Sequence, residues 1–135
     1  LRPTSGLLQI LQTIQNAAAR LIPNLPKRMH ITQHPKDLHW LPIQKRCQFK
    51  LLTHAYKALH NQGPDYMNHR LTFHQPSRIL RSVHLALAHT PRIRRSRSGG
   101  RSFSHLATKA WNTLHLRTSP SLNHFRKGLK TWLFS

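Results

Sequence analysis

The chain has 135 residues, with 22 Lys and Arg, 12 His and only two carboxylate side chains, Asp37 and Asp65. Its formal net charge is +20 with His neutral. Two-metal phosphoryl transfer and glycoside hydrolysis need clustered or paired carboxylates, so we expect a protein without catalytic activity of its own. The positive charge favours a polyanionic partner, which is RNA, DNA or an anionic membrane surface.

The length suits one small domain, residues 1–135, and the abundance of leucine beside a single valine predicts a mainly helical fold. Cys47 is the only cysteine, which excludes an intrachain disulfide and a Cys-cluster zinc site and is compatible with a reducing intracellular compartment. No apolar run reaches the roughly 18 residues of a membrane-spanning helix. The chain starts without an initiator Met or a signal-peptide pattern, so we interpret it as a fragment of a longer protein.

The first predicted helix covers residues 5–22 and ends before Pro23. Its apolar residues recur at helical spacing and form one stripe: Leu7, Ile10, Leu11, Ile14, Ala18 and Leu21. The simplest interpretation of this stripe is packing against the core. A coiled coil or docking on a partner is the alternative.

A second long helix is predicted from Pro42, at its first position, to about residue 61, with Gly63 as its stop signal. Apolar residues lie on two of its faces, which is typical of a central helix buried from two sides. Cys47 is therefore interpreted as a small buried hydrophobe. Trp40, just before this helix, is expected to anchor the core, with stacking on a nucleic-acid base as the alternative.

Downstream, a short helix is predicted at about 64–67. Residues 83–88 alternate apolar and other side chains, which is the best strand signal in the chain. We expect them to pair with residues 101–103 across a turn at Gly99-Gly100. The predicted fold is thus a small, mainly α domain with a minor two-stranded β element.

Two more helices are predicted, at about 104–114 and 120–134, the last with Ser119 as N-cap and Pro120 as first residue. The last helix carries an apolar stripe that is expected to face the core: Leu122, Phe125, Leu129, Trp132 and Leu133. Trp111 on the preceding helix is a further expected core residue. An anionic membrane surface is the alternative for the last helix, because basic residues flank its stripe.

Arginines are densest between residues 78 and 101, above all in the predicted loop at residues 92–101. The candidate nucleic-acid-binding residues are Arg78, Arg81, Arg92, Arg94, Arg95, Arg97 and Arg101. Guanidinium groups bind phosphate in bidentate fashion, and contacts to phosphate carry little sequence preference and strong salt dependence. The alternative interpretation is an unusually basic, solvated loop.

The histidines do not form a convincing metal site. His30 and His34 have the i, i+4 spacing of a helical ligand pair, but Pro35 disrupts that context. No Glu and no second Cys completes a tetrahedral set, so we expect no metal and no cofactor. No nucleophile elbow or Walker-type phosphate loop is present, and no catalytic residue is assigned.

Several segments, in this order and spacing, resemble the carboxy-terminal region of the reverse-transcriptase polyprotein of vertebrate non-LTR (LINE-type) retrotransposons. The resemblance spans nearly the whole chain and includes Leu38-His39-Trp40-Leu41-Pro42-Ile43 and Ala110-Trp111-Asn112-Thr113-Leu114. It also includes residues 15–21, 30–32, 49–50, 56–59, 76–78, 80–82, 101–104 and 119–122, followed by Phe125, Lys127 and residues 129–131.

The polymerase aspartates of that family lie upstream of this region, so the resemblance implies a non-catalytic accessory segment that helps to hold template RNA or target DNA. One alternative is an interaction module whose first helix docks on a missing upstream polymerase domain. Another is a functionless, decayed copy, because the chain has Gly100 where the family commonly has Asp, looks shortened between Leu114 and Ser119, and is rich in histidine.

Overall fold

The structure is a computed structural model that describes residues 5–22, 24, 26, 38–76, 78, 84–93, 100 and 102–135. Its elements are α1 (Ser5–Leu21), α3 (Ile43–Leu59), α4 (Asp65–Asn68), α6 (Phe103–Asn112), the 3-10 turn η2 (Leu116–Thr118) and α7 (Leu122–Phe134). The predicted mainly helical class is confirmed, and the described residues contain almost no strand.

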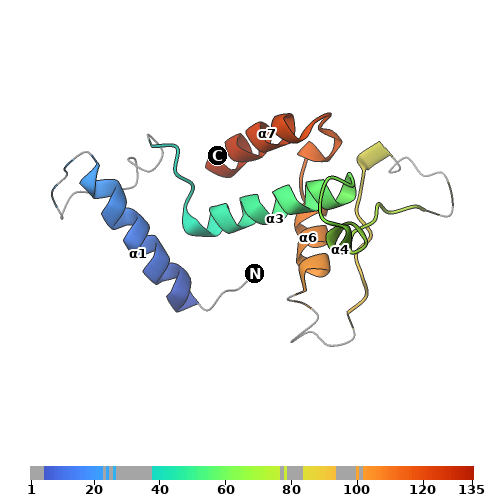
Figure 1. Cartoon of the computed structure of the whole chain (residues 1–135), viewed down its shortest axis with the longest axis horizontal. Helices are drawn as coiled ribbons and strands as arrows, with labels where there is room; N and C mark the ends of the chain where they lie inside the picture. The colour runs from blue at the N-terminus through green and yellow to red at the C-terminus, as the bar shows by residue number, and fades with distance from the viewer. Residues whose placement is uncertain are drawn as a thin grey trace.

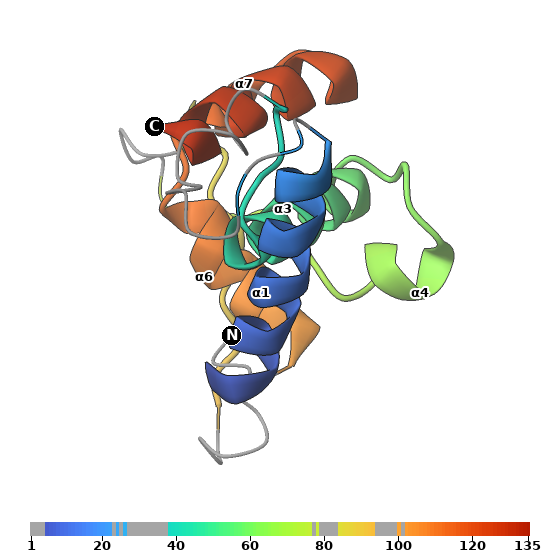
Figure 2. The same ribbon diagram turned by 90° about the vertical axis from the view of Figure 1, so that its left-hand side faces the viewer.

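Helix α3 is the central element, as its two apolar faces predicted. Helix α7 runs alongside it, α6 packs against it, and α1 crosses its N-terminal end (Figures 1 and 2). The core is built on three buried rings from these helices, Tyr56, Trp111 and Phe125. The ring centroids of Tyr56 and Phe125 are 4.7 Å apart, and those of Trp111 and Phe125 are 5.6 Å apart. This aromatic cluster therefore joins α3, α6 and α7 into one unit.

The ends of α3 differ slightly from the prediction. Pro42 has extended backbone angles and is the N-cap, so the helix begins at Ile43. At the other end, Asn61 takes the left-handed conformation with φ 55°, and the Gln62 N–H donates to the Lys57 carbonyl. These are the features of a Schellman cap, with Asn in the place that glycine usually takes. Gly63 is therefore not the residue that ends the helix.

The predicted pairing of 83–88 with 101–103 is wrong. Ala88 instead forms a single antiparallel bridge with Phe73, and Ser102 and Phe103 are the N-cap and first residue of α6. The other backbone edge of Ala88 is closed by the Asn112 side chain, which accepts from the Ala88 N–H at 2.9 Å and donates to its carbonyl at 3.0 Å. One side-chain amide thus takes the role that a second strand was expected to play.

Helix α7 begins two residues later than predicted. Ser121 is its N-cap, and its hydroxyl accepts from the His124 N–H. Ser119 belongs to the preceding turn, where its buried carbonyl accepts from the Tyr56 hydroxyl at 3.1 Å. The predicted core stripe of α7 is confirmed for Phe125, Leu129 and Leu133.

Three other residues that were expected in the core are less buried than predicted. Trp132 is 42 % exposed, because it projects from the flank of α7 instead of the face that meets α3. Trp40 is half-buried. Cys47 was expected to be buried but is exposed, since it lies on a flank of α3 that α6 and α1 leave partly open.

Helix α1 has the predicted bounds to within one residue, but its apolar stripe does not pack on the core. The helix faces α3 with its amide side chains. The Gln12 side chain accepts from the Ile43 N–H at 2.9 Å, and the Gln15 side chain donates to the Leu41 carbonyl at 2.9 Å. Gln12 thereby pairs one of the backbone N–H groups that every helix N-terminus leaves open, and this contact turns the apolar stripe of α1 outward.

Candidate nucleic-acid interface

Two of the seven predicted arginines lie within the described residues. Arg78 and Arg92 are both exposed. The other five, Arg81, Arg94, Arg95, Arg97 and Arg101, lie outside the described residues, so the basic loop as a unit stays a prediction.

Arg78 stands at one end of an open groove with a volume of about 1150 Å³. The bridge between Phe73 and Ala88 organises this groove. The His74 N–H donates to the Leu87 carbonyl at 2.7 Å, and the His89 N–H donates to the Thr72 carbonyl at 2.9 Å. Because side chains alternate along paired strands, His74 and His89 lie on the side opposite the buried Ala88.

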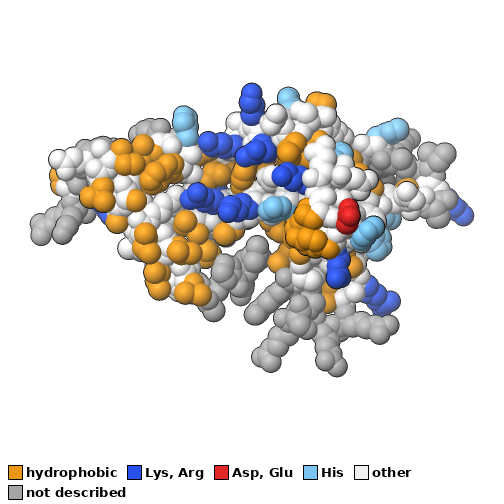
Figure 3. Space-filling model, viewed as in Figure 1, with side chains coloured by type: hydrophobic (Ala, Val, Ile, Leu, Met, Phe, Trp, Pro, Cys, Tyr) orange, Lys and Arg blue, Asp and Glu red, His pale blue; other side chains and the backbone are white. Residues whose placement is uncertain are grey.

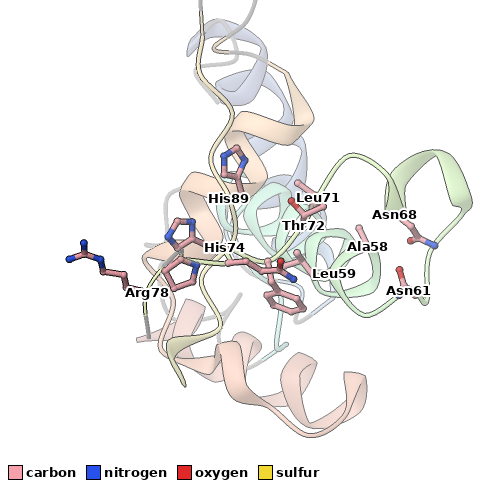
Figure 4. A pocket seen from close by; sticks show the side chains of 12 residues that line it. Ala58, Leu59, Asn61, Asn68, Leu71, Thr72, His74, Arg78 and His89 are labelled. Carbon is pink, nitrogen blue, oxygen red and sulfur yellow. The ribbon is translucent and has the colours of Figure 1, made fainter. Parts of the chain in front are cut away.

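Polar side chains stand among the apolar residues that line the groove. Figure 4 shows His74 and His89 on its walls, Arg78 extending outward beyond one end, and Asn61 and Asn68 at the other. None of the described residues that line it is a carboxylate. Imidazole, guanidinium and amide groups all donate hydrogen bonds to phosphate oxygens, so the groove has the chemistry of an anion-binding surface.

A second basic surface lies on α3, whose basic residues share the face left by the apolar ones but were given no binding role from the sequence. Arg46, Lys50 and Lys57 recur at i, i+4 and i+11 and therefore form one stripe on α3, opposite the buried Leu52 and Leu59. We call these three residues the α3 cationic stripe. Neither α3 nor α7 contains an acidic residue.

Basic side chains of α7 come close to this stripe. Arg126 and Lys130, at i and i+4 on α7, line the same hollow as Arg46. Figure 3 shows Lys and Arg side chains gathered over α3 and α7, beside the apolar surface of α1. Asp65, on α4, is the only carboxylate side chain among the described residues, so no acidic side chain on either helix offsets this positive field.

One arginine is occupied structurally. Arg117 donates from Nε to the Leu85 carbonyl at 2.8 Å and from Nη1 to the carbonyls of Asn112 and Leu114. It ties the segment before Ala88 to the end of α6. Arg117 is therefore a fold residue and not a candidate for ligand contact.

One histidine has a perturbed acidity. The His60 ring lies on Tyr56, with centroids 4.2 Å apart, and near the edge of Phe73. Desolvation by this partial burial lowers the pKa of His60 below its ordinary value of 6.5. The neutral form of the ring is thus favoured at the C-terminal end of α3.

The described part of the chain contains no cluster of three or more His, Cys, Asp or Glu side chains that could hold a metal ion. It also contains no helix whose length and apolar character would allow it to cross a membrane. No protein-family model, no curated protein and no solved structure matches this chain.

Proposed function

We propose that this chain is a non-catalytic accessory segment of a retrotransposon reverse transcriptase, and that it binds RNA or DNA through phosphates with little sequence preference. The resemblance of the sequence to the region after the polymerase supplies the context. The observation that carries the binding function is the α3 cationic stripe, whose exposed and partly exposed side chains share a helix with no acidic residue. Arg78 and Arg92 extend the phosphate contacts toward the basic loop.

The direct test is a titration of the full chain against a labelled oligonucleotide at several salt concentrations, read by fluorescence anisotropy. Binding should weaken steeply with salt because each phosphate contact releases counterions. An affinity that hardly changes between low and physiological salt would contradict phosphate contact.

Paired variants locate the contact. Lys50→Gln with Lys57→Gln should lower the slope of log affinity against log salt by roughly one for each lysine that touches phosphate. Arg78→Gln with Arg92→Gln should do the same for the predicted loop. The matched control, Arg70→Gln with Lys109→Gln, removes the same charge from exposed positions elsewhere. If all three pairs weaken binding equally, net charge alone and not a defined surface is responsible.

A second function, docking on another protein, is favoured by α1. Its apolar stripe lies exposed on the surface, and a contiguous exposed apolar patch is typical of a protein contact. The apolar stripe of α1 and the α3 cationic stripe have no residue in common, but Arg46 of the cationic stripe lines a hollow beside α1.

A further inference from the structure

The apolar surface of α1 continues into a groove. Six aliphatic side chains at one end of the chain are between 49 and 80 % exposed: Leu7, Ile10, Leu11, Ile14, Leu21 and Ile22. Leu11 and Ile14 also form one wall of a hollow of about 650 Å³ between α1, α3 and α7. Trp40, Ile43 and Phe49 complete its apolar lining.

The edge of this groove is cationic. Arg46 from α3 and Arg126 and Lys130 from α7 line it, and none of the described residues that line it is a carboxylate. Arg46, Arg126 and Lys130 are exposed. An occupant that buries itself against the apolar lining would therefore gain by presenting negative charge to these three side chains.

The groove also holds an unsatisfied hydrogen-bond acceptor. Gln15 is only 8 % exposed, and its amide nitrogen donates a hydrogen bond to the Leu41 carbonyl. Its Oε1 atom is buried and has no hydrogen-bond partner within the described residues. Buried polar atoms normally have a partner, so this oxygen marks a place for a donor from an occupant.

We propose that the groove is the docking site for an acidic amphipathic helix of a partner protein. The apolar face of that helix lies on Leu11, Ile14 and Phe49, and its acidic flank meets Arg46, Arg126 and Lys130. A donor side chain on it pairs with Gln15 Oε1. This inference deepens the docking function proposed above and does not depend on nucleic-acid binding.

A helix is the occupant that the pattern of α1 fits. Leu7, Leu11, Ile14, Ala18 and Leu21 follow the alternating spacing of four and three residues that receives the side chains of a neighbouring helix. A second copy of the chain fits poorly. Each copy carries a charge of +20 and has only Asp37 and Asp65 to set against the cationic edge.

The test uses the full chain and three labelled peptides as long as α1. The first is an amphipathic helix with Leu on one face and Glu on the flanks. The second has the same composition in a scrambled order that destroys the apolar face, and the third has Lys in place of Glu. The proposal expects tight binding of the first peptide and much weaker binding of the other two.

Variants assign the contacts. Leu11→Gln with Ile14→Gln should lower the affinity for the first peptide by about tenfold or more. Leu85→Gln, at an exposed leucine elsewhere, should leave that affinity unchanged. Arg126→Glu with Lys130→Glu should weaken binding of the Glu peptide and strengthen binding of the Lys peptide. Arg70→Glu with Lys109→Glu, at exposed positions outside the groove, is the control pair. Circular dichroism checks that each variant remains helical.

Three results would overturn the proposal. One is equal binding of the ordered and scrambled Glu peptides, which would show charge attraction alone. Another is a concentration-dependent dimer in sedimentation that Leu11→Gln with Ile14→Gln abolishes, which would assign the groove to a second copy. The third is displacement of the peptide by an oligonucleotide, if Leu11→Gln with Ile14→Gln also weakens binding of that oligonucleotide. This result would assign the groove to nucleic acid. A failure of the nucleic-acid proposal can be distinguished from a failure of the docking proposal. The nucleic-acid proposal is tested with Lys50→Gln and Lys57→Gln, and neither residue lines the groove.

Discussion

Helices α1 and α7 have similar sequence patterns and opposite surroundings. Each carries an apolar stripe at helical spacing, and each was predicted to pack on the core. In α7 the stripe is buried against the aromatic cluster, with Phe125 and Leu129 fully covered, whereas in α1 the stripe is on the surface. An amphipathic pattern thus identifies a contact face, but it does not say whether the same chain supplies the contact.

The difference arises from how each helix is attached. The turn before α7 is fixed by the bond from the Tyr56 hydroxyl to the Ser119 carbonyl, so α7 starts directly over the core. Helix α1 is attached through Gln12 and Gln15 to the backbone around the start of α3. These hydrogen bonds turn the polar face of α1 toward α3. Its apolar face is therefore left exposed on the surface.

The largest expected effect comes from truncating one residue in each stripe. Phe125→Ala should lower the free energy of unfolding by about 3–5 kcal/mol, because it opens a cavity between α3, α6 and α7. Ile14→Ala should change it by no more than about 0.5 kcal/mol, because Ile14 is already 60 % exposed. Urea denaturation followed by circular dichroism measures both. Equal losses would mean that the α1 stripe is part of the core after all.

A smaller effect is expected from the two amide attachments. Asn112→Ala leaves the Ala88 N–H and carbonyl without their partner and should cost roughly 1–3 kcal/mol of global stability. Gln12→Ala leaves the Ile43 N–H at the N-terminal end of α3 without its partner. It should mainly weaken the attachment of α1 to α3. Hydrogen exchange separates the two cases: protection should fall throughout for Asn112→Ala and chiefly within α1 for Gln12→Ala. Uniform loss in both variants would show that α1 is as integral as α6.

The smallest expected effect concerns pH and again belongs to the packed half of the molecule. The pKa of His60 is lowered by desolvation, so folding favours its neutral ring. Its contribution to stability is complete above the unfolded pKa of 6.5 and is lost as pH falls from 6.5 through the lower folded pKa. Unfolding free energies measured across this range should fall less steeply for His60→Phe than for the native chain. A slope for His60→Phe that is identical to that of the native chain would refute the assignment.

Local signals in the sequence were sufficient for the helices. Prolines, serine caps and apolar spacing predicted α1, α3, α4, α6 and α7 to within a few residues, because these signals act within one helical turn. The pairing of Ala88 was missed, since its partners Phe73 and Asn112 are distant in sequence and one of them is a side chain. The exposure of Cys47 and Trp132 was missed for a related reason: both lie on helix flanks, where only tertiary packing decides burial.

The candidate site was predictable only in part. Arg78 and Arg92 could be selected because they stand in a run of like charges. The sequence did not predict that Arg46 lies near Arg126 and Lys130. These residues are far apart along the chain, and their helices come together only in the folded protein. The i, i+4, i+11 spacing of Arg46, Lys50 and Lys57 was a visible signal that such a surface existed on α3.

The exposed position of Cys47 has a practical consequence. It is the only thiol in the chain, and it lines a second hollow together with Leu8 of α1 and Trp132 of α7. A maleimide dye or a nitroxide therefore attaches at one known point beside the junction of α1 and α3, with no engineered residue. The mobility of the attached probe would report directly whether α1 stays packed against α3 or separates from it when a ligand binds.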